Sequence, residues 1–197
     1  HWRAYQYMGL ARLAFATGHS YWGYRFLGWG LHHIQDLTQP YHAKPLPGAG
    51  LASLLLMEGK ALAGFDSDKH AAIQRVATRH MEVEKYQAAW LRRLLKAAEP
   101  HPMIAAYARL AEDADYPPYS VDYLREVVSA QAVAESAAFD EAIEQWLATA
   151  PATTDFSASN QVSREDYDHP QLNRQLLQLL GHFGAHSRIY VRAGLAP

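Results

Sequence analysis

The chain has 197 residues, of which 49% are hydrophobic and 19% charged, and its net charge is −2 with histidine neutral. This length and composition allow one sizeable folded domain and exclude a disordered tail. The near-neutral charge, without blocks of like charge, argues against electrostatic capture of nucleic acid or of an anionic membrane. Cysteine is absent, so disulfides are excluded and any metal must be held by nitrogen and oxygen ligands.

Helical periodicity predicts helices throughout the first half of the chain. The first covers residues 1–17 and ends at Gly18. A second helix, apolar nearly all round and therefore expected near the centre of the fold, follows and ends before Pro40. A loop rich in proline and glycine covers residues 44–50, and a short helix closed by glycine covers 51–64.

The second half continues the helical pattern. A long helix is expected over residues 66–100, with its N-cap among Asp66 to Asp68 and Pro100 as its stop, and a shorter one over 103–113. After a turn, another long helix covers 121–150, and the Ser- and Thr-rich stretch 151–166 is expected to be a mobile loop. The last helix covers residues 170–194, with proline in its first turn.

The sequence therefore predicts an all-α fold, a single multi-helix bundle domain over residues 1–197 with several long helices. No apolar run reaches the ~18–20 residues needed to span a bilayer. No signal peptide is visible and the first residue is not methionine, so we interpret the chain as a processed product or a trimmed fragment.

Three histidines and one aspartate lie close together where the second helix meets proline, in the stretch GWGLHHIQDLTQPYHAKPLPG. His32 and Asp36 are four residues apart, so they share a helix face with Cβ atoms ~5–6 Å apart, close enough to bind one metal ion. His33 is rotated off that face. Beyond Pro40, His42 can fold back across the helix end.

A second pair with the same spacing, His80 and Glu84, lies on the predicted long helix. Facing helices that present such pairs inward build metal sites in α-helical bundles. A lone pair of this kind is more often a capping or surface contact, so the spacing alone leaves both interpretations open. His182 and His186 also share a helix face, and we interpret them as a polar edge of the last helix.

The complete pattern resembles the signature of the zinc-dependent phospholipase C family, which is related to the P1/S1 nucleases. Its first part is an apolar LGxxLH helix, His-x3-Asp, five residues with Gln-Pro, and His-Ala, matched here by Leu27, Gly28, Leu31, His32, Asp36, Gln39, Pro40, His42 and Ala43. The next part is His-x3-Glu in the phospholipases, or His-x3-Asp in the nucleases, and then an aromatic residue; HMEVEKY supplies His80, Glu84 and Tyr86. The match is best over residues 4–86, and the family fold is all-α.

The resemblance implies specific roles for these residues. His42, His80 and Glu84 would form one zinc site with water at its open position, His32 would bind a second zinc, and Asp36 would bridge that ion to a third. Up to three Zn²⁺ ions are thus implied, with one site complete in this chain. Zinc accepts such nitrogen and oxygen ligands, and clustered ions of this kind promote phosphate ester hydrolysis.

Two departures from the family pattern affect these assignments. His42 and His80 are separated by 38 residues, a longer interval than the family predicts, which makes His70 an alternative ligand and suggests that the intervening segment is a flap beside the site. Family members also carry four ligand positions upstream, which His1 follows rather than supplies. We therefore expect that an N-terminal segment of the family fold is missing, together with the aspartate usually proposed as the general base.

On this resemblance, the leading hypothesis is a secreted or periplasmic zinc metallohydrolase that cleaves the phosphodiester of phospholipid head groups, with a membrane surface as one place where it would meet its substrate. A single-strand nuclease of the P1 type is the enzymatic alternative, which Glu84 in place of aspartate disfavours. The third alternative is a non-catalytic helical interaction module with a partial zinc site. Zinc content separates the module from the enzymes, and head-group release separates the phospholipase from the nuclease.

Overall fold

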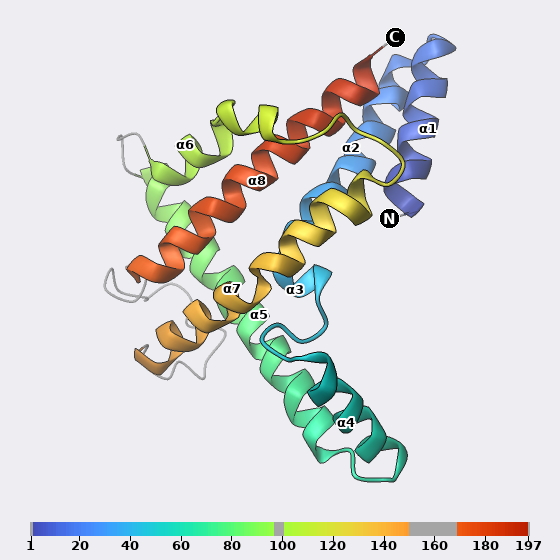
Figure 1. The fold of residues 1–197 in the computed structure, drawn as a ribbon. Coiled ribbons are helices and arrows are strands. Elements are labelled where there is room, and N and C mark those ends of the chain that lie inside the picture. The colour runs from blue at the N-terminus through green and yellow to red at the C-terminus, as the bar shows by residue number, and fades with distance from the viewer. Residues whose placement is uncertain (1, 97–100, 150–168, 197) are drawn as a thin grey trace.

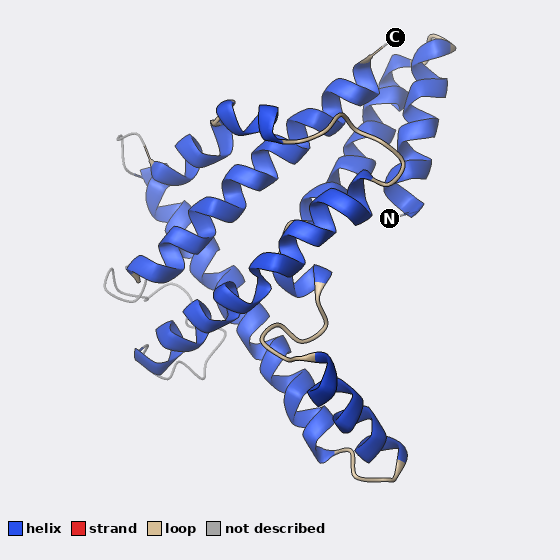
Figure 2. Cartoon of the chain, in the orientation of Figure 1, coloured by secondary structure: helices blue, strands red, loops and turns tan. Residues whose placement is uncertain are grey.

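The computed structural model describes residues 2–96, 101–149 and 169–196. Within these residues it contains eight α-helices, a short 3₁₀-helix and a π-helix, and no strand, so the predicted all-α fold is confirmed. Figure 2 shows the described residues as helices and connecting loops. No helix in the described part of the chain is long and apolar enough to cross a membrane. The predicted loop over 151–166 lies outside the described residues.

The first two helices form an antiparallel hairpin, α1 (Trp2–Ala16) and α2 (Ser20–Leu37). Gly18 joins them with φ of 78°, a left-handed conformation that glycine adopts at low cost, so the predicted stop is confirmed. The pair packs closely along its length at one end of the molecule (Figure 1).

Three shorter segments lead from the hairpin into the longest helix. A four-residue helix, α3 (Pro40–Ala43), follows the predicted break, and a loop leads to α4 (Leu51–Leu62). Helix α5 (Ser67–Lys96) then returns toward the body. No side chain of α4 is buried, and α4 with the start of α5 projects as a two-helix arm (Figure 1).

The next part of the chain differs from the sequence prediction at two points. The helix expected over 103–113 is divided into α6 (Pro102–Ala108) and a 3₁₀ segment, η1 (Ala111–Asp115). The helix expected over 121–150 begins as a π-helix, η2 (Leu124–Ser129), and continues as α7 (Ala130–Thr149). Apolar spacing cannot distinguish these windings, because they differ from the α-helix by one residue per hydrogen-bonded turn.

The last helix, α8 (Pro170–Leu195), connects two apolar clusters. Leu172, Leu176 and Leu179 in its first half pack with α5, α6 and α7, whereas Ile189 and Tyr190 in its second half pack with the α1–α2 hairpin and η2. Polar side chains occupy the interval between the clusters. Figure 1 shows α8 crossing the whole body, so this helix fixes the hairpin relative to the remaining helices.

Candidate metal centre

Three side chains from two distant segments converge beside the end of α2. The Nε2 atoms of His42 and His80 are 3.0 Å apart, and His80 Nε2 lies 3.0 Å from Glu84 Oε1. One ligand atom from each residue lies within 4.8 Å of the others. Among the described residues, His42, His80 and Glu84 are the group of three or more potential metal ligands whose ligand atoms lie this close together. The 38-residue interval therefore does not keep His42 and His80 apart.

Helix α3 and the end of α2 position His42. Gln39 caps α3, its side chain accepting from the Tyr41 amide at 3.5 Å, and Pro40 occupies the first helical position. His42 Nδ1 lies 3.0 Å from the Asp36 carbonyl oxygen and 2.8 Å from its carboxylate Oδ1. Nδ1 therefore donates to Asp36, which leaves Nε2 free to face the other two side chains.

A buried carboxylate fixes the backbone on which both histidines lie. Asp140 of α7 accepts from the Tyr41 hydroxyl at 2.6 Å and from Arg79 Nη1 at 2.5 Å. Tyr41, Arg79 and Asp140 are at most 9% exposed. Burial, followed by the bond to Asp140, raises the pKa of Tyr41 far above its usual value, so the phenol stays protonated and donates. Tyr41 directly precedes His42, and Arg79 directly precedes His80. The Asp140 carboxylate therefore holds together the two segments that carry the imidazoles.

The donor set and its spacing fit a zinc ion. Two imidazole nitrogens and one carboxylate oxygen are ordinary zinc ligands, and bonds of about 2.0–2.2 Å in a tetrahedron place neighbouring ligand atoms roughly 3.3 Å apart. The observed 3.0 Å separations approach that value. The side chains of His42 and His80 are 27% and 26% exposed, so solvent reaches the site. Three ligands with access for water are the pattern of a catalytic rather than a structural zinc.

A pocket of about 400 Å³ opens next to these side chains. Its walls include His42 and Glu84, and its other polar lining comes from neutral side chains of Gln35, Thr38, Gln39 and Gln87. Apolar side chains complete it, contributed by α5, α6 and α8: Ala88, Leu91, Met103, Leu179, Leu180 and Phe183. The pocket therefore offers an apolar surface and neutral hydrogen-bonding groups beside the candidate ligands, and no cationic side chain.

The remaining histidines of the sequence motif lie outside this group. His32 is exposed on α2 and its ring lies 5.5 Å from that of His33. His33 stacks on Tyr7 with ring centroids 5.9 Å apart, and burial lowers its pKa. His70 is exposed at the start of α5, 3.6 Å from Asp66. The structure thus brings together His42, His80 and Glu84, with Asp36 behind His42; it does not bring His32 or His70 into contact with them.

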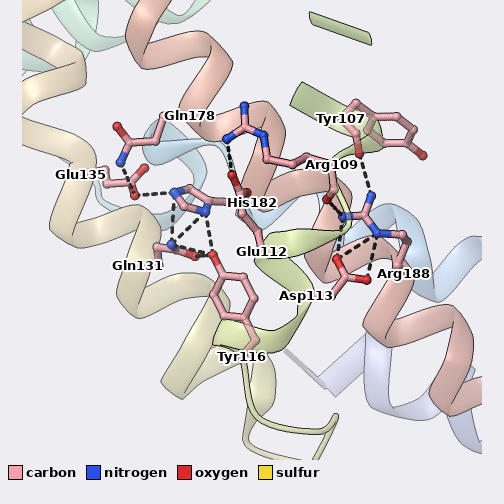
Figure 3. Close-up of polar contacts among 10 residues, drawn as sticks. All are labelled: Tyr107, Arg109, Glu112, Asp113, Tyr116, Gln131, Glu135, Gln178, His182 and Arg188. Atoms are coloured by element: carbon pink, nitrogen blue, oxygen red, sulfur yellow. Dashed lines mark hydrogen bonds and ion pairs between the residues drawn. The ribbon is translucent and has the colours of Figure 1, made fainter. Parts of the chain in front are cut away.

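His182 and His186, which the sequence predicts to be a polar edge of the last helix, lie in a polar network between α7, α8 and residue 116, where His186 is buried and His182 is partly buried. Figure 3 shows His182 with Tyr116, Gln131 and Glu135. His182 Nε2 donates to Glu135 at 2.9 Å, and its Nδ1 accepts from the Tyr116 hydroxyl at 2.6 Å. Gln131 contacts His182 and also accepts from His186 Nε2 at 2.9 Å. No local sequence signal indicates that network, because Gln131, which contacts both histidines, lies 51 residues from His182 and 55 from His186.

The free energy of unfolding should fall as the pH drops from about 6.5 to about 4, because of His186. In the folded chain its Nδ1 accepts from Tyr123 and its Nε2 donates to Gln131, so the ring is neutral. Burial, and secondarily His182, lowers its pKa to about 4. Between that value and the ordinary ~6.5, the unfolded chain binds the extra proton, so stability rises with pH, by on the order of 3 kcal/mol in total.

Urea unfolding at pH 4 to 8 measures this effect, with His186→Gln as the variant that cannot titrate. The difference between the two proteins isolates the contribution of His186 from that of every other ionisable group in the chain. If the difference in the free energy of unfolding between the native chain and His186→Gln stays constant between pH 4 and 6.5, the expectation is wrong.

Comparison of the chain with protein-family models, with curated proteins and with solved structures found no match. A function for the chain therefore rests on the side chains described above and on the motif in its sequence.

Proposed function

We propose that this chain is a zinc-dependent phosphodiester hydrolase, of the type that releases head groups from phospholipids. The observation that carries the proposal is the convergence of His42 Nε2, His80 Nε2 and Glu84 Oε1 at the rim of an apolar pocket. The order and spacing of these residues also resemble the phospholipase C signature, and Glu84 in place of aspartate favours the phospholipase over the nuclease.

Each group in the site has a definable task in this proposal. His42, His80 and Glu84 would hold one zinc ion, and Asp36 would keep His42 in the tautomer whose Nε2 bears the lone pair. A zinc ion bound there supplies a Lewis acid for a phosphoryl oxygen and lowers the pKa of bound water. The apolar wall would receive the hydrocarbon part of the substrate and exclude water, while the side-chain amides of Gln35, Gln39 and Gln87 in the pocket lining would offer hydrogen bonds to its polar part.

The geometry supports one ion more directly than three. His32 does not approach the group, and the Asp36 carboxylate contacts the outer nitrogen of His42. Further ions at His32 and Asp36, and a general base supplied from upstream of the chain, therefore stay predictions.

Activity assays on the zinc-loaded chain test the proposal. We expect release of a phosphorylated head group from short-chain phosphatidylcholine or phosphatidylethanolamine, lost on chelation and restored by zinc. Cleavage of single-stranded DNA instead would favour the nuclease. Stoichiometric zinc without hydrolysis of either substrate would overturn the proposal in favour of a non-catalytic module.

A further inference from the structure

The α1–α2 hairpin exposes an unusual number of aromatic side chains. Six Trp and Tyr residues on these two helices have at least 40% of their surface exposed: Trp2, Tyr5, Tyr21, Trp22, Tyr24 and Trp29. Leu10 and Leu13 of α1 are 42% and 61% exposed. Burying large apolar side chains stabilises a fold. The presence of this many exposed apolar side chains on one hairpin therefore indicates an interaction surface.

Three aromatic residues of α2 form one continuous row. Trp22 packs on Phe26 and Phe26 on Trp29, with ring centroids 5.8 and 5.6 Å apart. The guanidinium of Arg25 lies 5.1 Å from the ring centroid of Trp29 and 5.8 Å from that of Tyr21. These contacts hold the rings in fixed positions while their outer faces remain in solvent, so the surface is preorganised.

Charge is distributed unequally between this hairpin and the rest of the chain. Residues 2–35 contain three arginines, Arg3, Arg12 and Arg25, and no acidic residue. All 20 aspartates and glutamates lie at Asp36 or beyond. The overall charge of −2 therefore conceals a hairpin that is positive and a remainder that is negative. An anionic surface would be attracted by the hairpin and repelled by the other helices.

We propose that the solvent-exposed face of the α1–α2 hairpin docks on a lipid bilayer that contains anionic head groups. Tryptophan and tyrosine favour the interface between head groups and hydrocarbon, because the ring is apolar and the N–H or O–H stays hydrated. The exposed leucines add apolar area, and Arg12 and Arg25, whose partners in the chain are uncharged, keep the positive charge that attracts anionic lipids. The proposal goes beyond the hydrolase function and does not depend on it.

Two other occupants fit the surface less well. Single-stranded nucleic acid also stacks on aromatic rings, but it needs a groove of free cationic side chains along its phosphates. Here Arg12 donates to the Ala193 carbonyl oxygen and Arg25 lies over two rings, so two of the three arginines already have protein partners. A second copy of the chain would bring a positive hairpin against another positive hairpin, which costs energy in a two-fold dimer.

The surface also leads to the candidate metal centre. Tyr21, Arg25, Trp29 and His32 follow one another at three- or four-residue intervals and so share one face of α2. Asp36, one turn further, holds His42. A bilayer bound along this face would therefore lie next to the proposed zinc site.

Vesicle sedimentation in the presence of a chelator tests the docking proposal without any turnover. The chain is mixed with vesicles of phosphatidylcholine alone or of phosphatidylcholine with phosphatidylserine. We expect binding to the anionic vesicles, weakened by salt, and a blue shift of tryptophan fluorescence. The double variant Tyr21→Ser, Trp22→Ser should reduce the partition coefficient by roughly tenfold or more, because it removes two exposed interfacial rings.

A matched control replaces equally exposed apolar residues at the other end of the molecule. Leu55→Ser, Leu62→Ser on α4, where these side chains are 65% and 90% exposed, should leave vesicle binding unchanged. Arg25→Gln should weaken binding to anionic vesicles more than Arg174→Gln, an exposed arginine on α8. His80→Ala should bind vesicles normally, so failure of docking and failure of the metal site can be told apart.

Several outcomes would overturn the proposal. These are no sedimentation of the native chain with either vesicle, equal binding to both vesicle types, and equal losses in the aromatic and leucine variants. Binding to a single-stranded oligonucleotide that the aromatic variant loses, without vesicle binding, would assign the surface to nucleic acid. A dimer that depends on Tyr21 and Trp22 would assign it to self-association.

Discussion

Replacing His80 with alanine is expected to abolish tight zinc binding, with a loss of affinity of more than about 100-fold. Removing even a hydrogen-bonding partner of a ligand commonly lowers metal affinity 10–100-fold, and His80 supplies one of only three ligands. It is also the central one, since its Nε2 lies 3.0 Å from both His42 Nε2 and Glu84 Oε1. Without it the remaining two side chains cannot enclose an ion.

Zinc content after dialysis and competition with a chromogenic chelator measure this loss. His70→Ala is the matched control, because His70 lies on the same helix, is exposed and contacts Asp66 instead of the cluster. It should retain full zinc binding. Circular dichroism should show equal helix content in both variants. Equal zinc affinity in His80→Ala and the native chain would refute the site, and loss confined to His70→Ala would transfer the ligand to that residue.

Replacing Asp140 with alanine is expected to destabilise the chain by about 3–5 kcal/mol even without metal. The substitution leaves Arg79 buried without its main counter-charge and leaves the Tyr41 hydroxyl without an acceptor. Glu144 still contacts Arg79 at 2.8 Å, but its side chain is 65% exposed and compensates little. Zinc affinity should fall as well, since Tyr41 and Arg79 would no longer hold the segments of His42 and His80 together.

Urea unfolding of the metal-free protein measures the loss of stability, and zinc titration measures the loss of zinc affinity. Asp122→Ala provides a surface control: its carboxylate pairs with Arg125 but is 50% exposed, so the loss should stay below about 1 kcal/mol. Asp140→Asn keeps an acceptor for Tyr41 and should lie between the native chain and the alanine variant. A destabilisation by Asp140→Ala no larger than that by Asp122→Ala would show that the buried pair does not hold these segments.

The helices were predictable because apolar spacing, glycine stops and prolines act locally. The order of His42, His80 and Glu84 was visible too, since these ligand types recur in a known pattern. What the sequence could not show is the support of the site. Asp140 lies 99 residues from Tyr41 and 61 from Arg79, and no periodicity marks it as their partner.

The position of Asp36 shows a second limit of sequence reasoning. Spacing places its carboxylate on the face of His32, and a helix of any length would do the same. The direction that the chain takes after Pro40 brings His42 Nδ1 to that carboxylate instead. Likewise, the burial of His186 depends on Tyr123 and Gln131, which reach it only through tertiary packing.

The arm formed by α4 and the first turns of α5 is part of a loop that is closed at its base, because Asp140 bonds both Tyr41 before the arm and Arg79 after it. The entropy of closing such a loop grows only with the logarithm of its length, at about 0.6 kcal/mol for each doubling. Residues added at the tip, where Gly64 turns the chain with φ of 88°, therefore change the closure entropy very little. The tip can therefore accept an inserted peptide while the two imidazoles near the base of the arm keep their positions.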